Sequence, residues 1–185
     1  MARARIAAIS EHTATMSRSS NRVEANALPW LGLSVLLIGI DQLTKVWAES
    51  ALQFQRPVPV IDGLMNWTLT YNEGAAFSFL SDASGWQRWF FSALAIGISG
   101  MLVFWLRKIP RHDWRHALPF ALVIAGALGN LIDRLRLGHV VDFIDVYWGA
   151  SHWPAFNVAD SAISVGAVLL LLFGVVFHKN EGKPA

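Results

Sequence analysis

A chain of 185 residues has the length of one domain, and its composition indicates a membrane protein: 54% of the residues are hydrophobic, only 15% are charged and nine are tryptophan. The net charge of +2 is too small to indicate a nucleic-acid partner. The lack of cysteine excludes disulfides, thiol catalysis and cysteine-ligated metal sites.

Residues 1–27 are polar, with four arginines scattered among serine, threonine and alanine. Such a segment cannot bury a core, so we expect a disordered cytoplasmic tail. A cleaved secretory signal is the alternative. It is disfavoured because the apolar stretch starts late, no small-residue cleavage site follows it, and further apolar segments come after it.

Four apolar segments follow, each near the roughly 20 residues that a membrane-spanning helix requires. They cover residues 28–51, 86–106, 117–137 and 159–178. The sequence therefore predicts an all-α membrane core of four transmembrane helices within a domain of residues 28–178, followed by a cytoplasmic C-terminal tail at 179–185.

Basic residues concentrate on one side of this predicted topology. They occur in the N-terminal tail, in the link between the second and third segments and at the C-terminus. Because loops rich in lysine and arginine stay in the cytoplasm, we expect both termini there. Four polar residues then fall toward the outer face: Asp41, Asn72, Asp142 and Asp160.

The first apolar segment contains Asp41 and Lys45, which are four residues apart and share a helix face. We interpret them as a structural polar pair, with Lys45 extending along the helix to reach the outer interface. A direct chemical role for Asp41 is the alternative, because carboxylates within membrane segments are costly and often functional.

Residues 54–80 do not have a helical pattern. The stretch 65–72 alternates apolar and polar residues, and Asp62-Gly63 before it is a hairpin signal. We therefore predict a small extracytoplasmic β-sheet. Its last strand leads to Asn72, which either helps to bind a substrate chain or caps a tight turn.

The third apolar segment places Gly126, Asn130 and Asp133 on one helix face, with Arg134 beside Asp133. The polar side chains either form a structural network between helices or support catalysis. Gly126 would allow close approach of a substrate or of a neighbouring helix.

A short amphipathic stretch at 140–148 carries Asp142 and Asp145, and aromatic residues follow it. Because aromatic rings favour the headgroup region, we expect residues of about 140–155 to lie along the outer interface. Asn157 is the expected N-cap of the fourth helix. Asp160, in its first turn, would by itself be explained as a residue that complements the helix dipole.

Asp142 and Asp160 have a different significance when they are considered together. Each borders a membrane element at the same face, and a short loop separates them. Two carboxylates that share a site cannot both ionise cheaply, so the pair holds one proton. The helix N-terminus favours the charge on Asp160 and leaves the proton on Asp142. Such a dyad can activate water and protonate a peptide carbonyl.

Five blocks of the sequence resemble, in order and spacing, those of bacterial lipoprotein signal peptidase (signal peptidase II). They are Asp41-Gln42-Leu43-Thr44-Lys45, Asn72-Glu73-Gly74-Ala75-Ala76-Phe77, Gly129-Asn130-Leu131-Ile132-Asp133-Arg134, Val140-Val141-Asp142-Phe143 and Phe156-Asn157-Val158-Ala159-Asp160-Ser161. One such block is weak evidence, but five in register are specific. The resemblance extends over residues 28–178.

This resemblance implies an aspartyl endopeptidase of the inner membrane, with its active site at the outer face. Its substrates would be prolipoproteins, cut just before the diacylglyceryl-modified cysteine. The implied catalytic residues are Asp142 and Asp160, and the implied supporting residues are Asn72, Asn130, Asp133, Arg134 and Asn157. We add Gly126 to the candidate substrate-binding or supporting residues because it would allow close approach. The resemblance also implies contact with membrane lipid, inhibition by globomycin-type compounds, a monomer, and no cofactor, metal or nucleic acid.

Two other classes of function compete with this interpretation. A small transporter or proton-relay subunit would distribute acidic groups through the membrane, whereas here they gather toward one face. A non-catalytic assembly factor would use the same polar residues only to hold helices together. A metal site is a weak alternative, because only His112 and His116 have helical ligand spacing.

Overall fold

The computed structural model describes residues 25–74 and 85–178. The predictions for residues 1–24, 75–84 and 179–185 lie outside this range. Residues 25–27, the end of the predicted N-terminal tail, pack against the bundle in the structure. Ala27 is fully buried, and its amide donates to the carbonyl oxygens of Leu106 at 3.0 Å and Ile109 at 3.1 Å.

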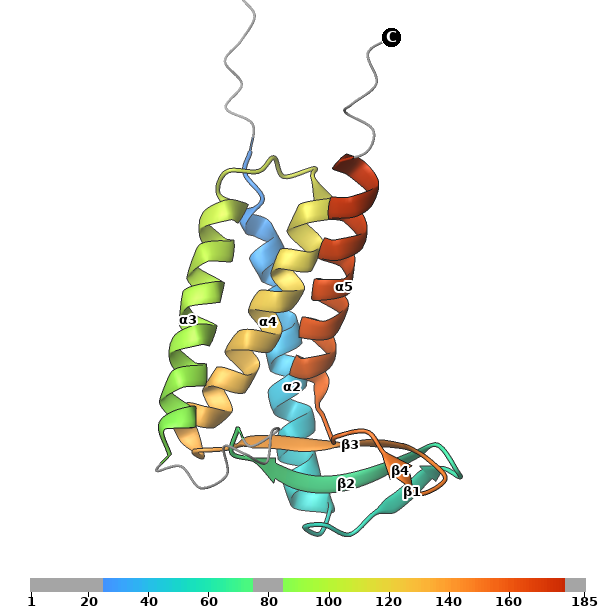
Figure 1. Ribbon diagram of the computed structural model, residues 1–185. Coiled ribbons are helices and arrows are strands. Elements are labelled where there is room, and N and C mark those ends of the chain that lie inside the picture. Colours follow the sequence, from blue (N-terminus) through green and yellow to red (C-terminus); the bar gives the residue numbers. More distant parts are fainter. Residues whose placement is uncertain (1–24, 75–84, 179–185) are drawn as a thin grey trace, which may run out of the picture.

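The helices lie side by side as a bundle (Figure 1). They are the 3₁₀ helix η1 (Leu28–Trp30) and the α-helices α2 (Leu31–Ala51), α3 (Trp86–Leu106), α4 (Trp114–Arg136) and α5 (Val158–His178). α4 packs against each of the other three α-helices, which makes it the centre of the bundle. The four apolar segments are therefore confirmed as helices, and the third begins three residues earlier than predicted.

A four-stranded antiparallel sheet covers one end of the bundle, opposite the end where both described chain ends lie (Figure 1). Its strands, in their order across the sheet, are β1 (Val58–Ile61), β2 (Met65–Asn72), β3 (Val140–Trp148) and β4 (Ser151–His152). The hairpin predicted at Asp62-Gly63 is confirmed, and Gly63 has the positive φ of 78° that such a turn requires.

The stretch at 140–148 is β3, a strand of this sheet and not a separate amphipathic segment. It pairs with β2 from Met65 opposite Val146 to Asn72 opposite Val140. Its first four residues, Val-Val-Asp-Phe, are all buried. Because both faces of the strand are covered there, its sequence lacks the alternation of apolar and polar residues that marks a half-buried strand. The paired residues of β2 lie 68 to 81 positions earlier in the chain, and no local pattern could identify them.

The outer surface of the bundle is apolar, with large side chains exposed on the helices, among them Val35, Leu43, Trp89 and Leu171. Within the described residues, three helical stretches are long and apolar enough to cross a membrane: Leu28–Ala51, Trp86–Leu106 and Trp114–Arg136. The corresponding apolar stretch of α5, Val158–Phe173, is shorter. These surfaces are those of an integral membrane protein.

Small residues bring α4 close to its neighbours at the sheet end. A Cβ atom at Gly126 would overlap the carbonyl oxygen of Ala159 and lie 2.6 Å from the side chain of Ile163, both on α5. A Cβ atom at Gly129 would lie 2.7 Å from the Asp41 carboxylate on α2. Of the two possible neighbours predicted for Gly126, the structure therefore shows a helix.

Gly126→Ala should separate α4 from α5, because the added methyl group has no space beside the Ala159 backbone. We expect a loss of about 1–3 kcal/mol in the free energy of unfolding, measured as a lower melting temperature of the detergent-purified protein. Gly39→Ala is the matched control, since nothing lies within 4 Å of its added Cβ atom. Equal melting temperatures for the two variants would contradict this packing.

Candidate active site

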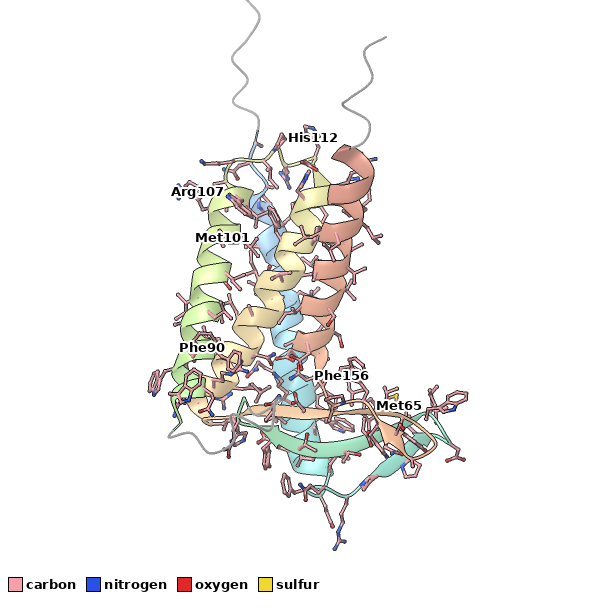
Figure 2. All side chains as sticks on the ribbon, in the orientation of Figure 1. Met65, Phe90, Met101, Arg107, His112 and Phe156 are labelled. Atoms are coloured by element: carbon pink, nitrogen blue, oxygen red, sulfur yellow. The ribbon has the colours of Figure 1, made fainter. Side chains whose placement is uncertain are left out.

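Buried polar side chains collect where the helix bundle meets the sheet. Apart from Ser34, which bonds to Ala121, the polar side chains with at most 2% of their surface exposed come from α2, α4, β3 and the start of α5: Asp41, Lys45, Asp133, Asp142 and Asn157. Figure 2 shows Phe156 at this junction, whereas Arg107 and His112 lie at the opposite end of the bundle. Burying so many charges requires that each one has a partner.

Lys45 on α2 is the cation of this cluster. Its Nζ lies 2.9 Å from the Asp41 carboxylate and 2.8 Å from that of Asp133, and it donates to Asn130 Oδ1 at 2.9 Å. An ammonium group has three protons, and all three have acceptors here. The prediction that Lys45 reaches toward the interface is therefore wrong, because the interior offers it two carboxylates and an amide oxygen.

The two carboxylates paired with Lys45 also bind backbone amides of neighbouring elements. Asp41 accepts a hydrogen bond from the Ala159 amide on α5 at 2.9 Å, and Asp133 accepts one from the Val141 amide on β3 at 3.2 Å. The ion pairs thus connect α2 and α4 with the two elements that carry Asp142 and Asp160.

Gln42 also belongs to this network, which was not predicted from the sequence. Its amide donates to Asp133 at 2.9 Å and to Asp41 at 3.2 Å. Two sequence signals could have identified it: its position directly after Asp41 and its place in the block Asp41-Gln42-Leu43-Thr44-Lys45. A polar residue beside a membrane carboxylate is a reasonable candidate for a second partner.

The start of α5 is capped reciprocally. Asn157 Oδ1 accepts from the Asp160 amide at 2.9 Å, and Asp160 Oδ2 accepts from the Asn157 amide at 3.2 Å. This is the arrangement of a capping box, so Asp160 does have the capping function that its position indicated. Its other carboxylate oxygen accepts from Asn130 Nδ2 at 2.7 Å and faces the polar cluster.

Asn157 also connects the two candidate catalytic carboxylates. Its Nδ2 donates to Asp142 Oδ1 at 2.7 Å while its backbone and Oδ1 hold Asp160. One fully buried amide side chain therefore binds Asp142 from β3 and Asp160 from α5. The structure brings together two residues that lie 18 positions apart in the sequence.

Burial, together with the negative charge of Asp160, raises the pKa of Asp142 from 3.8 to about 7. Hydrogen bonds from Asn72 and Asn157 oppose this increase in pKa without cancelling it. Asn72 also accepts a hydrogen bond from the Gly74 amide at 2.9 Å, so the turn-capping explanation for Asn72 holds as well. Near neutral pH, both the protonated and the ionised forms of Asp142 are therefore populated.

Arg134 lies beside the cluster on the last turn of α4. Its guanidinium stands 5.1 Å from the centre of the Phe91 ring and interacts electrostatically with Asp160 and Asp142. Two positive charges therefore act on the aspartates: that of Lys45 on α2, and that of Arg134 on the helix that also supplies Asn130 and Asp133.

Two hollows flank the aspartates. One, of about 410 Å³, contains Asp142 and is lined by Asn72, Pro154 and Ala155 among others. The other, of about 380 Å³, contains Asp160 and is lined mainly by α5 and by the aromatic residues Trp153 and Phe156. The segment 153–156 contributes to both hollows and lies between them.

Among the described residues, no group of three or more histidine, aspartate or glutamate side chains is arranged to hold a metal ion. His116 lies 2.8 Å from Asp113, near the end of the bundle away from the sheet. The pair His112 and His116, singled out for its spacing, is therefore remote from the cluster described above.

Comparisons with known proteins agree on one family. The family model described as signal peptidase (SPase) II matches residues 33–176. Relatives described as lipoprotein signal peptidase include one from Xanthomonas oryzae pv. oryzae, 61% identical, covering 90% of this chain and 99% of the relative. One from Xylella fastidiosa is 56% identical, covering 85% and 95%.

Two solved structures, both described as a bacterial membrane enzyme, have the same fold. The first has a TM-score of 0.73 and 31% sequence identity, covering 85% of this chain and 93% of the other. The second has a TM-score of 0.69 and 32% identity, covering 80% and 92%.

Lys45→Met should strongly destabilise the protein, because it leaves the carboxylates of Asp41 and Asp133 buried without their cation. We expect a loss of about 3–5 kcal/mol, read as a large decrease in melting temperature. Lys108→Met removes the same charge from an exposed position and serves as the control. A similar small change in both variants would show that the buried ion pairs contribute little.

Proposed function

The chain belongs to the signal peptidase (SPase) II family, and from this premise we propose that it removes signal peptides from prolipoproteins. The scissile bond is the one before the diacylglyceryl-modified cysteine. The enzyme is an aspartyl endopeptidase that needs no cofactor. The observation that supports this most directly is the binding of Asp142 and Asp160 to one buried asparagine, Asn157.

In the proposed mechanism the two carboxylates share one proton. The ionised carboxylate accepts a proton from a water molecule, whose oxygen attacks the scissile carbonyl carbon. The protonated carboxyl group donates to the carbonyl oxygen, which gives a neutral tetrahedral diol. The carboxyl group that took the proton from water then donates it to the amide nitrogen. A hydroxyl of the diol returns a proton to the other carboxylate as the C–N bond breaks, which restores the singly protonated pair. The pKa of Asp142, about 7, supports Asp142 as the proton donor.

The supporting side chains have distinct roles in this proposal. Asn130 and Asn157 orient Asp160 and Asp142 through hydrogen bonds of 2.7 Å each. Asp133 and Lys45 hold β3 and α2 in register beneath them. Asn72 lines the hollow that contains Asp142, and Arg134 interacts electrostatically with both aspartates. We expect the amide and guanidinium donors of these two side chains to bind carbonyl groups of the substrate backbone.

The membrane topology proposed here has four spans. α5 has 21 residues, which at 1.5 Å per residue is about 31 Å and matches the hydrocarbon core. Both termini are cytoplasmic, and the sheet lies on the outer surface of the bacterial inner membrane. A substrate whose acyl chains remain in the outer leaflet would then present its cleavage site at the depth of Asp142 and Asp160.

Further consequences follow for partners. The protein should act as a monomer, contact membrane lipid and bind globomycin-type inhibitors at the same site.

The transporter alternative is less well supported by the geometry. The fully and nearly buried charged side chains of the described residues all lie near the sheet, whereas the core at the other end consists of residues such as Leu106, Phe120 and Ile124.

Asp142→Asn and Asp160→Asn should each reduce cleavage of a diacylglyceryl prolipoprotein by about 10²- to 10⁴-fold or more, because each removes one member of the acid–base pair. The purified, reconstituted protein is assayed with and without a chelator, which should have no effect. Asp62→Asn, in the exposed hairpin turn, should cleave normally. Full activity in either site variant would refute the dyad.

The pH dependence should follow Asp142. Its pKa in the folded protein is raised from 3.8 to about 7, so its proton is retained up to near neutral pH and lost above it. We expect kcat/KM to fall as the pH rises above about 7, when both carboxylates ionise. Between pH 3.8 and about 7 the folded protein keeps this proton while the unfolded chain has lost it. Folding stability therefore falls as the pH rises through this interval and does not change further above it, so wild type should lose melting temperature relative to Asp142→Asn from pH 3.8 to about 7. A flat profile to pH 9 would contradict this assignment.

A further inference from the structure

A second buried carboxylate, Asp145, takes no part in the mechanism above. It lies on β3 and has 6% of its surface exposed. One of its oxygens accepts hydrogen bonds from Asn66 and Thr68 on β2, both at 3.1 Å. The other oxygen accepts from Nδ1 of His152 on β4 at 2.7 Å. Burial by itself would raise the pKa of Asp145, but these hydrogen bonds outweigh it and lower the pKa.

His152 is held from a second side as well. Its ring stacks on that of Tyr147, with centroids 5.1 Å apart and planes 15° from parallel. The Tyr147 hydroxyl in turn accepts a hydrogen bond from the Gly63 amide in the β1–β2 turn at 2.9 Å. The imidazole therefore fits between a carboxylate and an aromatic ring that are both fixed by β1, β2 and β3. Half of the His152 side chain remains exposed.

The residues that follow His152 lead directly to the candidate active site. Trp153 donates its amide to Val146 at 2.8 Å, and Phe156 exchanges two backbone hydrogen bonds with Ile144 at 2.8 and 3.0 Å. The segment 153–156 therefore runs along β3 until it reaches Asn157. Pro154, in the middle of this segment, has no amide proton to donate.

Both hollows depend on the position of this segment. Trp153 and Phe156 face the hollow that contains Asp160, and Pro154 and Ala155 line the hollow that contains Asp142. One end of the segment is fixed by Asn157, which is part of the dyad. The other end is fixed by β4, a strand of only two residues. So short a strand supplies few backbone hydrogen bonds. The side chain of His152 adds a hydrogen bond to the charged carboxylate of Asp145.

We propose that Asp145 and His152 are positioning residues that hold the segment 153–156 in place as the shared wall of the two hollows. This inference rests on the function proposed above, since the wall would contact the substrate on both sides of the scissile bond. Neither residue touches the reacting atoms. Loss of the contact should loosen the wall and weaken substrate binding, while the chemistry of Asp142 and Asp160 is preserved.

The test compares His152→Ala, His152→Asn and Ser151→Ala in the purified full chain. Asparagine can place an amide donor where Nδ1 of histidine lies, so it should restore the hydrogen bond to Asp145. Ser151 is the neighbouring exposed residue of β4 and serves as the matched control. We expect His152→Ala to raise KM for a diacylglyceryl prolipoprotein about tenfold, with kcat changed by less than about twofold. His152→Asn and Ser151→Ala should stay near wild type.

Hydrogen exchange provides a readout that does not depend on cleavage. The amides of Trp153 and Phe156 should exchange about tenfold faster in His152→Ala than in Ser151→Ala, as expected if a hydrogen bond worth about 1.4 kcal/mol is lost. Unchanged exchange, or a His152→Ala enzyme with wild-type KM, would overturn the proposal. So would equal losses in the alanine and asparagine variants. If wild type itself does not cleave the substrate, the proposed function is wrong. The exchange rates would still show whether Asp145 and His152 hold the segment 153–156 in place.

Discussion

The placement of one buried cation determines much of this structure. Lys45 lies between Asp41 and Asp133 at 2.9 and 2.8 Å, with almost no exposed surface. An isolated charge at this depth would cost several kcal/mol, so the three side chains are stable there only together. Because each carboxylate also binds a backbone amide of α5 or β3, their arrangement dictates where the two candidate catalytic aspartates lie.

The elements of secondary structure serve the site directly. The capping of α5 by Asn157 is a local necessity, since the first amides of any helix need acceptors. Here the same asparagine also donates from its Nδ2 to Asp142, so that the helix terminus and the dyad depend on one residue. In the same way, the close contact of Gly126 with Ala159 brings Asn130 within 2.7 Å of Asp160.

The sheet is more than a cover on the bundle. β3 carries Asp142, and the segment 153–156 is hydrogen-bonded to β3 in the antiparallel direction before the chain enters α5. His152 lies just before this segment and bonds to Asp145, which in turn accepts a hydrogen bond from Asn66 on β2. The polar contacts of the sheet thus act on both hollows beside the aspartates, although most of them are remote from any reacting atom.

Local patterns in the sequence were sufficient for the helices, the hairpin at Asp62-Gly63 and the capping of α5 by Asn157, because periodicity and turn chemistry involve residues close in the chain. The spacing of Asp41 and Lys45 likewise predicted their pairing. Only the tertiary structure decided that Lys45 turns inward, that Gln42 joins it, that 140–148 is a strand, and that Asp145 meets His152. Each of these depends on a partner contributed by another element, and the energy of a buried polar group is determined by the partners that surround it.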